Sequence, residues 1–174
     1  MSTYIPLNKL GEGIQKSIDN ASRYLQDAVF LHQNKRYQSS ILLSMLSYEE
    51  AGKALLLMDY EKKKKLVTRR QWKRKFCNHK RKNLVSIRAI WQDAGYVSRI
   101  PDSDVWQAKF DVDWKNVFTY TDYDFENLKW TSPMISKTFG IGDVEQFSHN
   151  AMSHAADALK CIIRRVREFE SQAE

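Results

Sequence analysis

Hydrophobic residues recur at helical spacing in four stretches of this chain. In the first, about residues 8–33, they form one stripe that predicts an amphipathic helix with a buried face: Leu10, Ile14, Ile18, Ala21, Leu25, Ala28 and Val29. After a short polar connection at residues 34–36, a second stretch over about 37–61 is apolar on nearly every side. A helix of that kind usually lies at the centre of a bundle.

The third and fourth stretches carry start and stop signals as well as stripes. A helix over about 69–94 is predicted, with Thr68 as its N-cap and Gly95 as its stop. The last helix is expected to begin at about 142–143, where Asp143 and Gln146 resemble a capping box. Both carry apolar stripes, of which Trp72, Phe76 and Ile87 in the third and Ala155, Ala158 and Ile162 in the last are examples.

Residues 95–142, between the last two helices, are rich in aromatic side chains, which argues against disorder. We expect a short helix over about 104–117, a small hairpin within 116–130, and an ordered flap that covers a polar site or a dimer face. The pattern as a whole predicts a single all-α domain over residues 1–174, a bundle of four main helices with this aromatic-rich insertion.

Composition narrows the function classes. Three prolines and six glycines in 174 residues favour helices, and no apolar run is long enough to span a membrane. The first residues do not resemble a secretion signal, and two cysteines without a motif indicate reduced thiols in a cytoplasmic protein. Metal-binding spacings, glycine-rich phosphate loops and a serine-hydrolase elbow are all missing from the sequence, so we expect neither a metal nor another cofactor.

Within residues 39–58 of the second helix the only charges are Glu49, Glu50 and Lys53. Glu49 and Lys53 are four residues apart and lie within the apolar stripe, where a charge is costly to bury. Either they form an ion pair that serves the helix alone, or they belong to a polar site inside the bundle.

Four histidines are candidates for proton transfer, and His79 is the strongest. It shares one flank of the third helix with Lys82, Asn83 and Ser86, and this polar seam could face Glu49, Glu50 and Lys53 across two packed helices. An imidazole beside a carboxylate can act as a general acid or base near neutral pH, or it can simply satisfy a core carboxylate.

The other three histidines are expected to be structural. His32 ends the stripe of the first helix and reads as a packing or helix-end group. His149 is predicted on the surface, whereas His154 flanks the stripe of the last helix and could reach the interior.

Twelve Lys or Arg residues and no acidic residue lie between residues 62 and 82, and they account for much of the net charge of +7. Such a block can neutralise several phosphates of RNA or DNA, or it can be a solvated helix face with a linker. The residues that we expect to contact nucleic acid are Arg69, Arg70, Lys73, Lys75, Lys80 and Arg81.

Two segments resemble a known family. Residues 37–53, YQSSILLSMLSYEEAGK, followed by a basic segment with HKRKNL at 79–84, resemble the AbiV family of abortive infection proteins, and Asn20, Ala21, Leu25, Asp27 and Ala28 fit its opening pattern. The resemblance covers about residues 10–92.

This resemblance implies a domain of the HEPN class (higher eukaryotes and prokaryotes nucleotide-binding), a helical bundle that often forms a homodimer. Many such domains are metal-independent RNases whose signature is Arg, four to six residues, then His. Arg74 and His79 have that spacing. On a continuous helix they would point about 140° apart, so Arg74 would face away from the seam unless the helix begins after it or a partner subunit completes the site.

Three functions are compatible with these observations. The first is a ribonuclease-type defence effector in which His79 transfers the proton, Glu49 or Glu50 orients it, and Lys53 or Lys82 stabilises the charged phosphorane. The second is a non-enzymatic defence or regulatory protein that binds a phage or host protein, or the translation machinery, through its basic face or aromatic flap. The third is a bundle with a small-molecule pocket lined by Glu49, Lys53 and His79.

Overall fold

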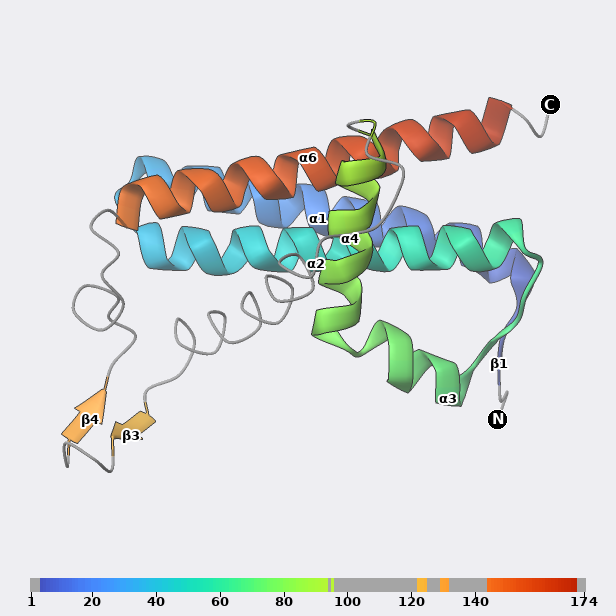
Figure 1. Cartoon of the computed structure of the whole chain (residues 1–174), viewed down its shortest axis with the longest axis horizontal. Coiled ribbons are helices and arrows are strands. Elements are labelled where there is room, and N and C mark those ends of the chain that lie inside the picture. The colour runs from blue at the N-terminus through green and yellow to red at the C-terminus, as the bar shows by residue number, and fades with distance from the viewer. Residues whose placement is uncertain (1–3, 94, 96–121, 125–128, 132–143, 172–174) are drawn as a thin grey trace.

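The computed structural model describes residues 4–93, 95, 122–124, 129–131 and 144–171. Three long helices lie side by side: α1 (Leu10–Gln33), α2 (Tyr37–Lys62) and α6 (Val144–Ser171). A fourth, α4 (His79–Asp93), runs across them against α2 and α6 (Figure 1). The predicted all-α class and the four main helices are confirmed.

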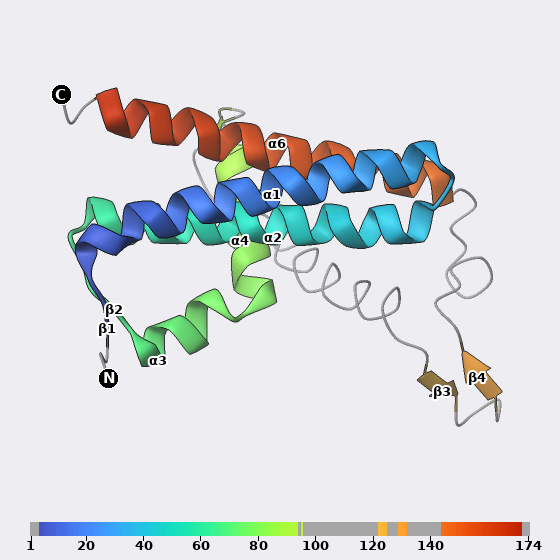
Figure 2. The ribbon, with the colours of Figure 1, turned by 180° about the vertical axis from the view of Figure 1, so that it is seen from behind.

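Helix α2 lies at the centre of the bundle, because it packs against α1, α6 and α4, and α1 and α4 lie on opposite faces of it (Figure 2). Its contact with α1 is close because the facing residues are small. Ser40 and Ser47 of α2 donate hydrogen bonds of 2.7 Å to the backbone carbonyls of Ala28 and Ala21. The stripe of α1 is largely buried as predicted, but Val29 at its edge is 39% exposed. At about 100° per residue it lies a further 20° round the helix than any other member of the stripe.

The predicted helix over 69–94 is wrong in one respect, since it is not continuous. The short helix α3 (Arg69–Gln71) leads into a π-helical turn, η2 (Trp72–Phe76). The helical structure is then interrupted at residues 77–78 before α4 begins. Thr68 is the predicted N-cap of the first piece, where it forms a capping box with Gln71. Asn78 starts the second piece, because its Oδ1 accepts a hydrogen bond from the backbone N–H of Arg81 at 2.9 Å.

A two-stranded ladder also holds this region, and helical periodicity gave no sign of it. Strand β1 (Tyr4–Ile5), which precedes the turn η1 (Leu7–Lys9), pairs antiparallel with β2 (Val67–Thr68). The pairing fixes the start of the chain beside the entry to α3. A second antiparallel pair, β3 (Asp122–Asp124) and β4 (Lys129–Thr131), matches the expected hairpin to within one residue.

Other expectations for the insertion, namely the helix over 104–117 and the role as a flap, lie outside the described residues, as does the cap at Asp143. Gly95 does follow the end of α4, and its φ of +87° suits a glycine at a helix stop. In the part of the chain that the structure describes, no helix is long and apolar enough to cross a bilayer.

Gly52 sets the distance between α2 and α4. A Cβ atom at this position would collide with the backbone carbonyl of Lys82 and would lie 2.8 Å from the Ser86 hydroxyl. Only a residue without a side chain allows the two backbones to approach this closely. Because the two backbones are this close, the hydroxyl of Ser86 on α4 can donate a 3.0 Å hydrogen bond to the backbone carbonyl of Tyr48 on α2.

The C-terminal end of α4 is fastened to α6 by charge. Asp93 pairs with Arg164 and, at 3.0 Å, with Arg165. Burial alone would raise the pKa of the Asp93 carboxyl, but hydrogen bonds from Cys161 and Arg165, with the charge of the arginines, hold it below its usual value. Burial and the contact with Asp93 raise the pKa of Cys161 to about 12, so this cysteine stays a thiol.

We predict that Gly52→Ala destabilises the protein by about 2–3 kcal/mol, because the new methyl group must push α4 away from α2. Gly11→Ala is the matched control, since its Cβ would meet only Glu61 Oε1 at 3.5 Å. It should leave stability unchanged or raise it through helix propensity. Urea denaturation followed by circular dichroism measures both variants, and equal stability of the two would contradict the proposed close approach.

We also predict that Asp93→Asn lowers the free energy of unfolding by an amount that depends on pH. Because the folded pKa of Asp93 lies below the unfolded value of 3.8, the ionised carboxyl stabilises the fold above about pH 4, and this contribution disappears as pH falls through the folded pKa. The difference in unfolding free energy between wild type and variant should therefore be full at pH 7 and shrink below pH 4. A difference that is constant with pH would show that the ion pairs do not stabilise the fold.

Candidate functional site

The centre of the candidate site is the carboxylate of Glu49, which is 3% exposed. One of its oxygens, Oε2, lies 2.5 Å from Nδ1 of His79 and 3.1 Å from Nζ of Lys82. Two residues from α4 thus converge on one residue from α2, at the place where Gly52 brings the helices together. Of the predicted seam along α4, His79 and Lys82 contact Glu49.

His79 is the member of this cluster that solvent can reach. Its side chain is 45% exposed, whereas those of Glu49 and Lys82 are 3% and 6% exposed. When the neutral ring donates its Nδ1–H to Glu49, its lone pair is on Nε2. The carboxylate therefore fixes both the orientation and the tautomer of an accessible imidazole, as a base or acid would require.

Lys82 is buried and not at the surface, where the sequence had suggested it could contact a phosphate. Its side chain lies against Glu49. Its charge compensates the carboxylate, which would otherwise be unpaired in the interior. Asn83, the next residue, is 2% exposed, and its Oδ1 is buried without a hydrogen-bond partner among the described residues.

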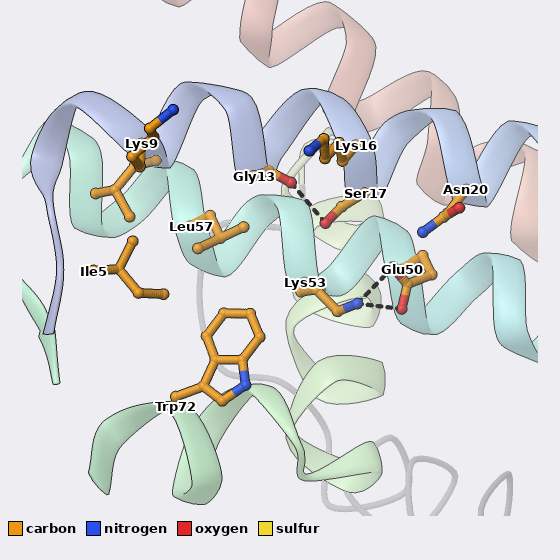
Figure 3. Close-up of a pocket in the computed structure, with 11 residues that line it drawn as sticks. Ile5, Lys9, Gly13, Lys16, Ser17, Asn20, Glu50, Lys53, Leu57 and Trp72 are labelled. Atoms are coloured by element: carbon orange, nitrogen blue, oxygen red, sulfur yellow. Dashed lines mark hydrogen bonds and ion pairs between the residues drawn. The ribbon is translucent and has the colours of Figure 1, made fainter. Parts of the chain in front are cut away.

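An ion pair between Glu49 and Lys53 was one of the two alternatives that the sequence left open. Lys53 instead bonds both oxygens of Glu50, at 2.5 and 2.6 Å. Consecutive residues of a helix point about 100° apart, so Glu49 is directed at α4 while Glu50 and Lys53 line a pocket beside α1 (Figure 3). Glu49 and His79 are not among the residues that line it, which corrects the expectation of one pocket formed by Glu49, Lys53 and His79.

Most of the predicted nucleic-acid contacts are exposed on one continuous segment, α3 through the start of α4: Arg69, Arg70, Lys73, Lys80 and Arg81. Arg74, a candidate for the catalytic site, is exposed on the same segment. Figures 1 and 2 show this segment outside the three long helices. Lys75 differs, because it is half-buried and donates a 2.8 Å hydrogen bond to the hydroxyl of Tyr60. This contact holds Lys75 against α2.

The break at residues 77–78 changes the relation between Arg74 and His79. The 140° separation applies only to a continuous helix, and Arg74 lies in the π-helical turn before the break whereas His79 is the first residue of α4. Their separation of five residues in the sequence therefore no longer argues against a shared site. Periodicity alone could not place this break, although Asn78, a preferred capping residue, was a signal for it.

The remaining histidines lie away from this cluster. His32 is half-buried and its Nδ1 is 2.9 Å from the hydroxyl of Ser148, a helix-end contact as expected. His149 is exposed as predicted. His154 is exposed as well and does not reach the interior. Among the described residues no group of three or more His, Cys, Asp or Glu side chains could hold a metal ion.

The sequence matches a known protein family. The HEPN_AbiV family model, described as AbiV, matches residues 9–139, which is more than half of the chain. The chain belongs to the AbiV family. This membership extends the resemblance beyond residue 92 and supports the role of an abortive-infection defence protein with a HEPN-class helical bundle.

The matched region of this AbiV protein contains α1, α2 and α4, and therefore the whole Glu49 cluster, but it ends before α6. Searches of curated proteins and of solved structures gave no match.

We predict strong coupling between Glu49 and Lys82. Glu49→Gln should cost about 3 kcal/mol because it leaves Lys82 buried without its carboxylate, and Lys82→Met should cost about as much because it removes the buried positive charge that compensates Glu49. The double variant should cost clearly less than the sum. Asp59→Asn, which removes an exposed pair with Lys63, is the control and should change stability little. Additive losses in urea denaturation would mean that the two side chains do not interact.

Proposed function

We propose that this AbiV protein is a metal-independent endoribonuclease that acts on RNA in abortive infection. The observation that carries the proposal is an accessible histidine, His79, held by a buried carboxylate at the edge of a basic surface. RNA contains its own nucleophile, the 2′-hydroxyl, so the protein has only to transfer protons and stabilise charge.

In the proposed reaction the 2′-oxygen forms a bond to the adjacent phosphorus, and the bond from phosphorus to the 5′-oxygen of the next nucleotide breaks. The products are a 2′,3′-cyclic phosphate and a new 5′-hydroxyl. His79, through Nε2, takes the proton of the 2′-hydroxyl or gives one to the leaving 5′-oxygen, and water accepts or supplies the other proton. Glu49 stabilises the ring when it carries the additional charge, and Lys82 holds Glu49 in place.

Charge on the phosphorane needs exposed cations, and the burial of Lys82 removes it from that role. Lys80 and Arg81 follow His79 at the first turn of α4 and are exposed, as is Arg74 before the break. A phosphate beside His79 would also lie near the positive end of the α4 dipole. We therefore assign charge stabilisation to Arg74, Lys80 and Arg81, and the more distant Arg69, Arg70 and Lys73 to binding of the RNA chain.

A second candidate function has one observation in its favour. Glu49 and Lys82 are both buried, and a cluster that serves structure alone would be buried in the same way. In that case the protein acts by binding a phage or host protein, and the exposed basic segment is its contact surface. Partial exposure of His79 favours the nuclease.

The purified protein should cleave single-stranded RNA in the presence of EDTA and leave 2′,3′-cyclic phosphate ends. His79→Ala should lower the rate at least about 100-fold, while His149→Ala, which removes another exposed histidine, should leave it unchanged. Cleavage products resolved on gels and by mass spectrometry give both results.

Glu49→Gln separates positioning from catalysis. It should lower the rate less than His79→Ala and shift the pH profile, because the ring loses its charged partner. Absence of cleavage by a wild-type protein with a normal unfolding transition would refute the nuclease and favour the protein-binding function.

A further inference from the structure

A second site lies on the other side of the same turn of α2. A pocket of about 220 Å³ opens between α1, α2 and the π-helical turn, and Figure 3 shows the side chains around it. Ile5, Leu10 and Leu57 supply apolar walls, and Trp72 closes the pocket on the side away from α1. Neither Glu49 nor His79 contributes, so the pocket is distinct from the candidate catalytic cluster.

Trp72 gives the pocket an aromatic surface that is already held in place. One face of its indole stacks on the buried ring of Phe76, with centroids 4.8 Å apart and planes 14° apart. The other face and the ring edge are therefore what Trp72 offers to the pocket. A rigid aromatic surface of this kind binds flat rings, and proteins use it to stack single nucleobases.

Three polar groups lie at the end of the pocket opposite Ile5: Asn20, Glu50 and Lys53 (Figure 3). Oδ1 of Asn20 accepts a hydrogen bond from Arg23, so its amide nitrogen is the group that can donate to a ligand. The nitrogen is directed towards Glu50. Lys53 uses two of its three donors on Glu50 and keeps one, while the carboxylate keeps lone pairs on both oxygens.

In order along the pocket, Asn20 offers a hydrogen-bond donor, Glu50 an acceptor and Lys53 a second donor. Uracil presents the complementary order on its Watson–Crick edge, with a carbonyl, an N–H and a second carbonyl. Adenine begins with an amino group, and cytosine presents an amino group and two acceptors, so both leave polar groups in the site unpaired, at a cost. The volume also fits a single base better than a larger ligand, because pockets for drug-sized molecules hold about 300–1,000 Å³.

Charge at the rim suits a phosphate. Lys9 and Lys16 line the pocket and are exposed, and both pair with Glu12. With the Lys53–Glu50 pair included, three lysines face two carboxylates, which leaves one positive charge. A phosphodiester carries one negative charge and could be held there.

We propose that this pocket binds one uracil nucleotide, with the base stacked on Trp72 and read by Asn20, Glu50 and Lys53, and the phosphate held by Lys9 and Lys16. Two sources share this chemistry, a uridine within the RNA substrate and a free uridine monophosphate. Only the first rests on the proposed nuclease function, in which the pocket would select the nucleotide placed near His79.

Calorimetric titration of the full-length protein tests the proposal. The probes are the four nucleoside monophosphates and two short single-stranded 2′-O-methyl RNAs, one of uridines and one of adenosines, which cannot be cleaved. Uridine probes should bind about tenfold more tightly than adenosine probes. A preference among the free monophosphates identifies a free nucleotide as ligand, whereas a preference confined to the oligonucleotides identifies RNA.

Asn20→Leu should abolish the preference for uridine, because it removes the donating amide without touching the stack of Trp72 on Phe76. Lys35→Gln, an exposed lysine between α1 and α2, is the matched control and should keep the preference. Equal affinity for uridine and adenosine probes, absence of binding to any of them, or a preference that persists in Asn20→Leu would each overturn the proposal. Because the probes are not cleaved, the result does not depend on whether the protein is a nuclease.

Discussion

The close approach of α4 to α2 at Gly52 determines how the bundle and its buried charges fit together. A side chain there would collide with the backbone carbonyl of Lys82, and the same approach brings the side chains of Lys82 and His79 to Glu49. The buried charges lose their contact with water, and they are stabilised only because the two helices are close enough for them to pair. The helices can be this close only because residue 52 is a glycine.

Two neighbouring carboxylates on one turn of α2 divide the polar interior into two sites. Glu49 is directed at α4 and holds an imidazole that solvent reaches, while Glu50 pairs with Lys53 beside α1 in a pocket closed by Trp72. The basic segment links the two, because Trp72 lies in its π-helical turn and His79 begins the helix that follows. A nucleic acid bound along this segment would meet both sites, which is why we assign catalysis to one and base recognition to the other.

Sequence patterns predicted the class of the fold and three of the long helices closely, since apolar stripes are dictated by burial. They also identified His79 and Glu49, because a charge within the apolar surface of a central helix needs a partner. They did not predict which acid pairs with Lys53, since i,i+3 and i,i+4 partners are equally near on a helix and packing against α1 and α4 decides. The break before His79 and the ladder of Tyr4–Ile5 with Val67–Thr68 were missed because a capping asparagine and two-residue strands carry weak local signals.

The tautomer of His79 reports directly on its hydrogen bond to Glu49. In ¹⁵N-labelled protein, long-range nitrogen–proton correlation spectra distinguish the two neutral forms of a histidine ring, at a pH where the ring is uncharged. We predict that His79 carries its proton on Nδ1, bonded to Glu49, and that Glu49→Gln weakens or removes this preference. A ring protonated on Nε2 in the wild-type protein, with a spectrum that Glu49→Gln does not change, would contradict it.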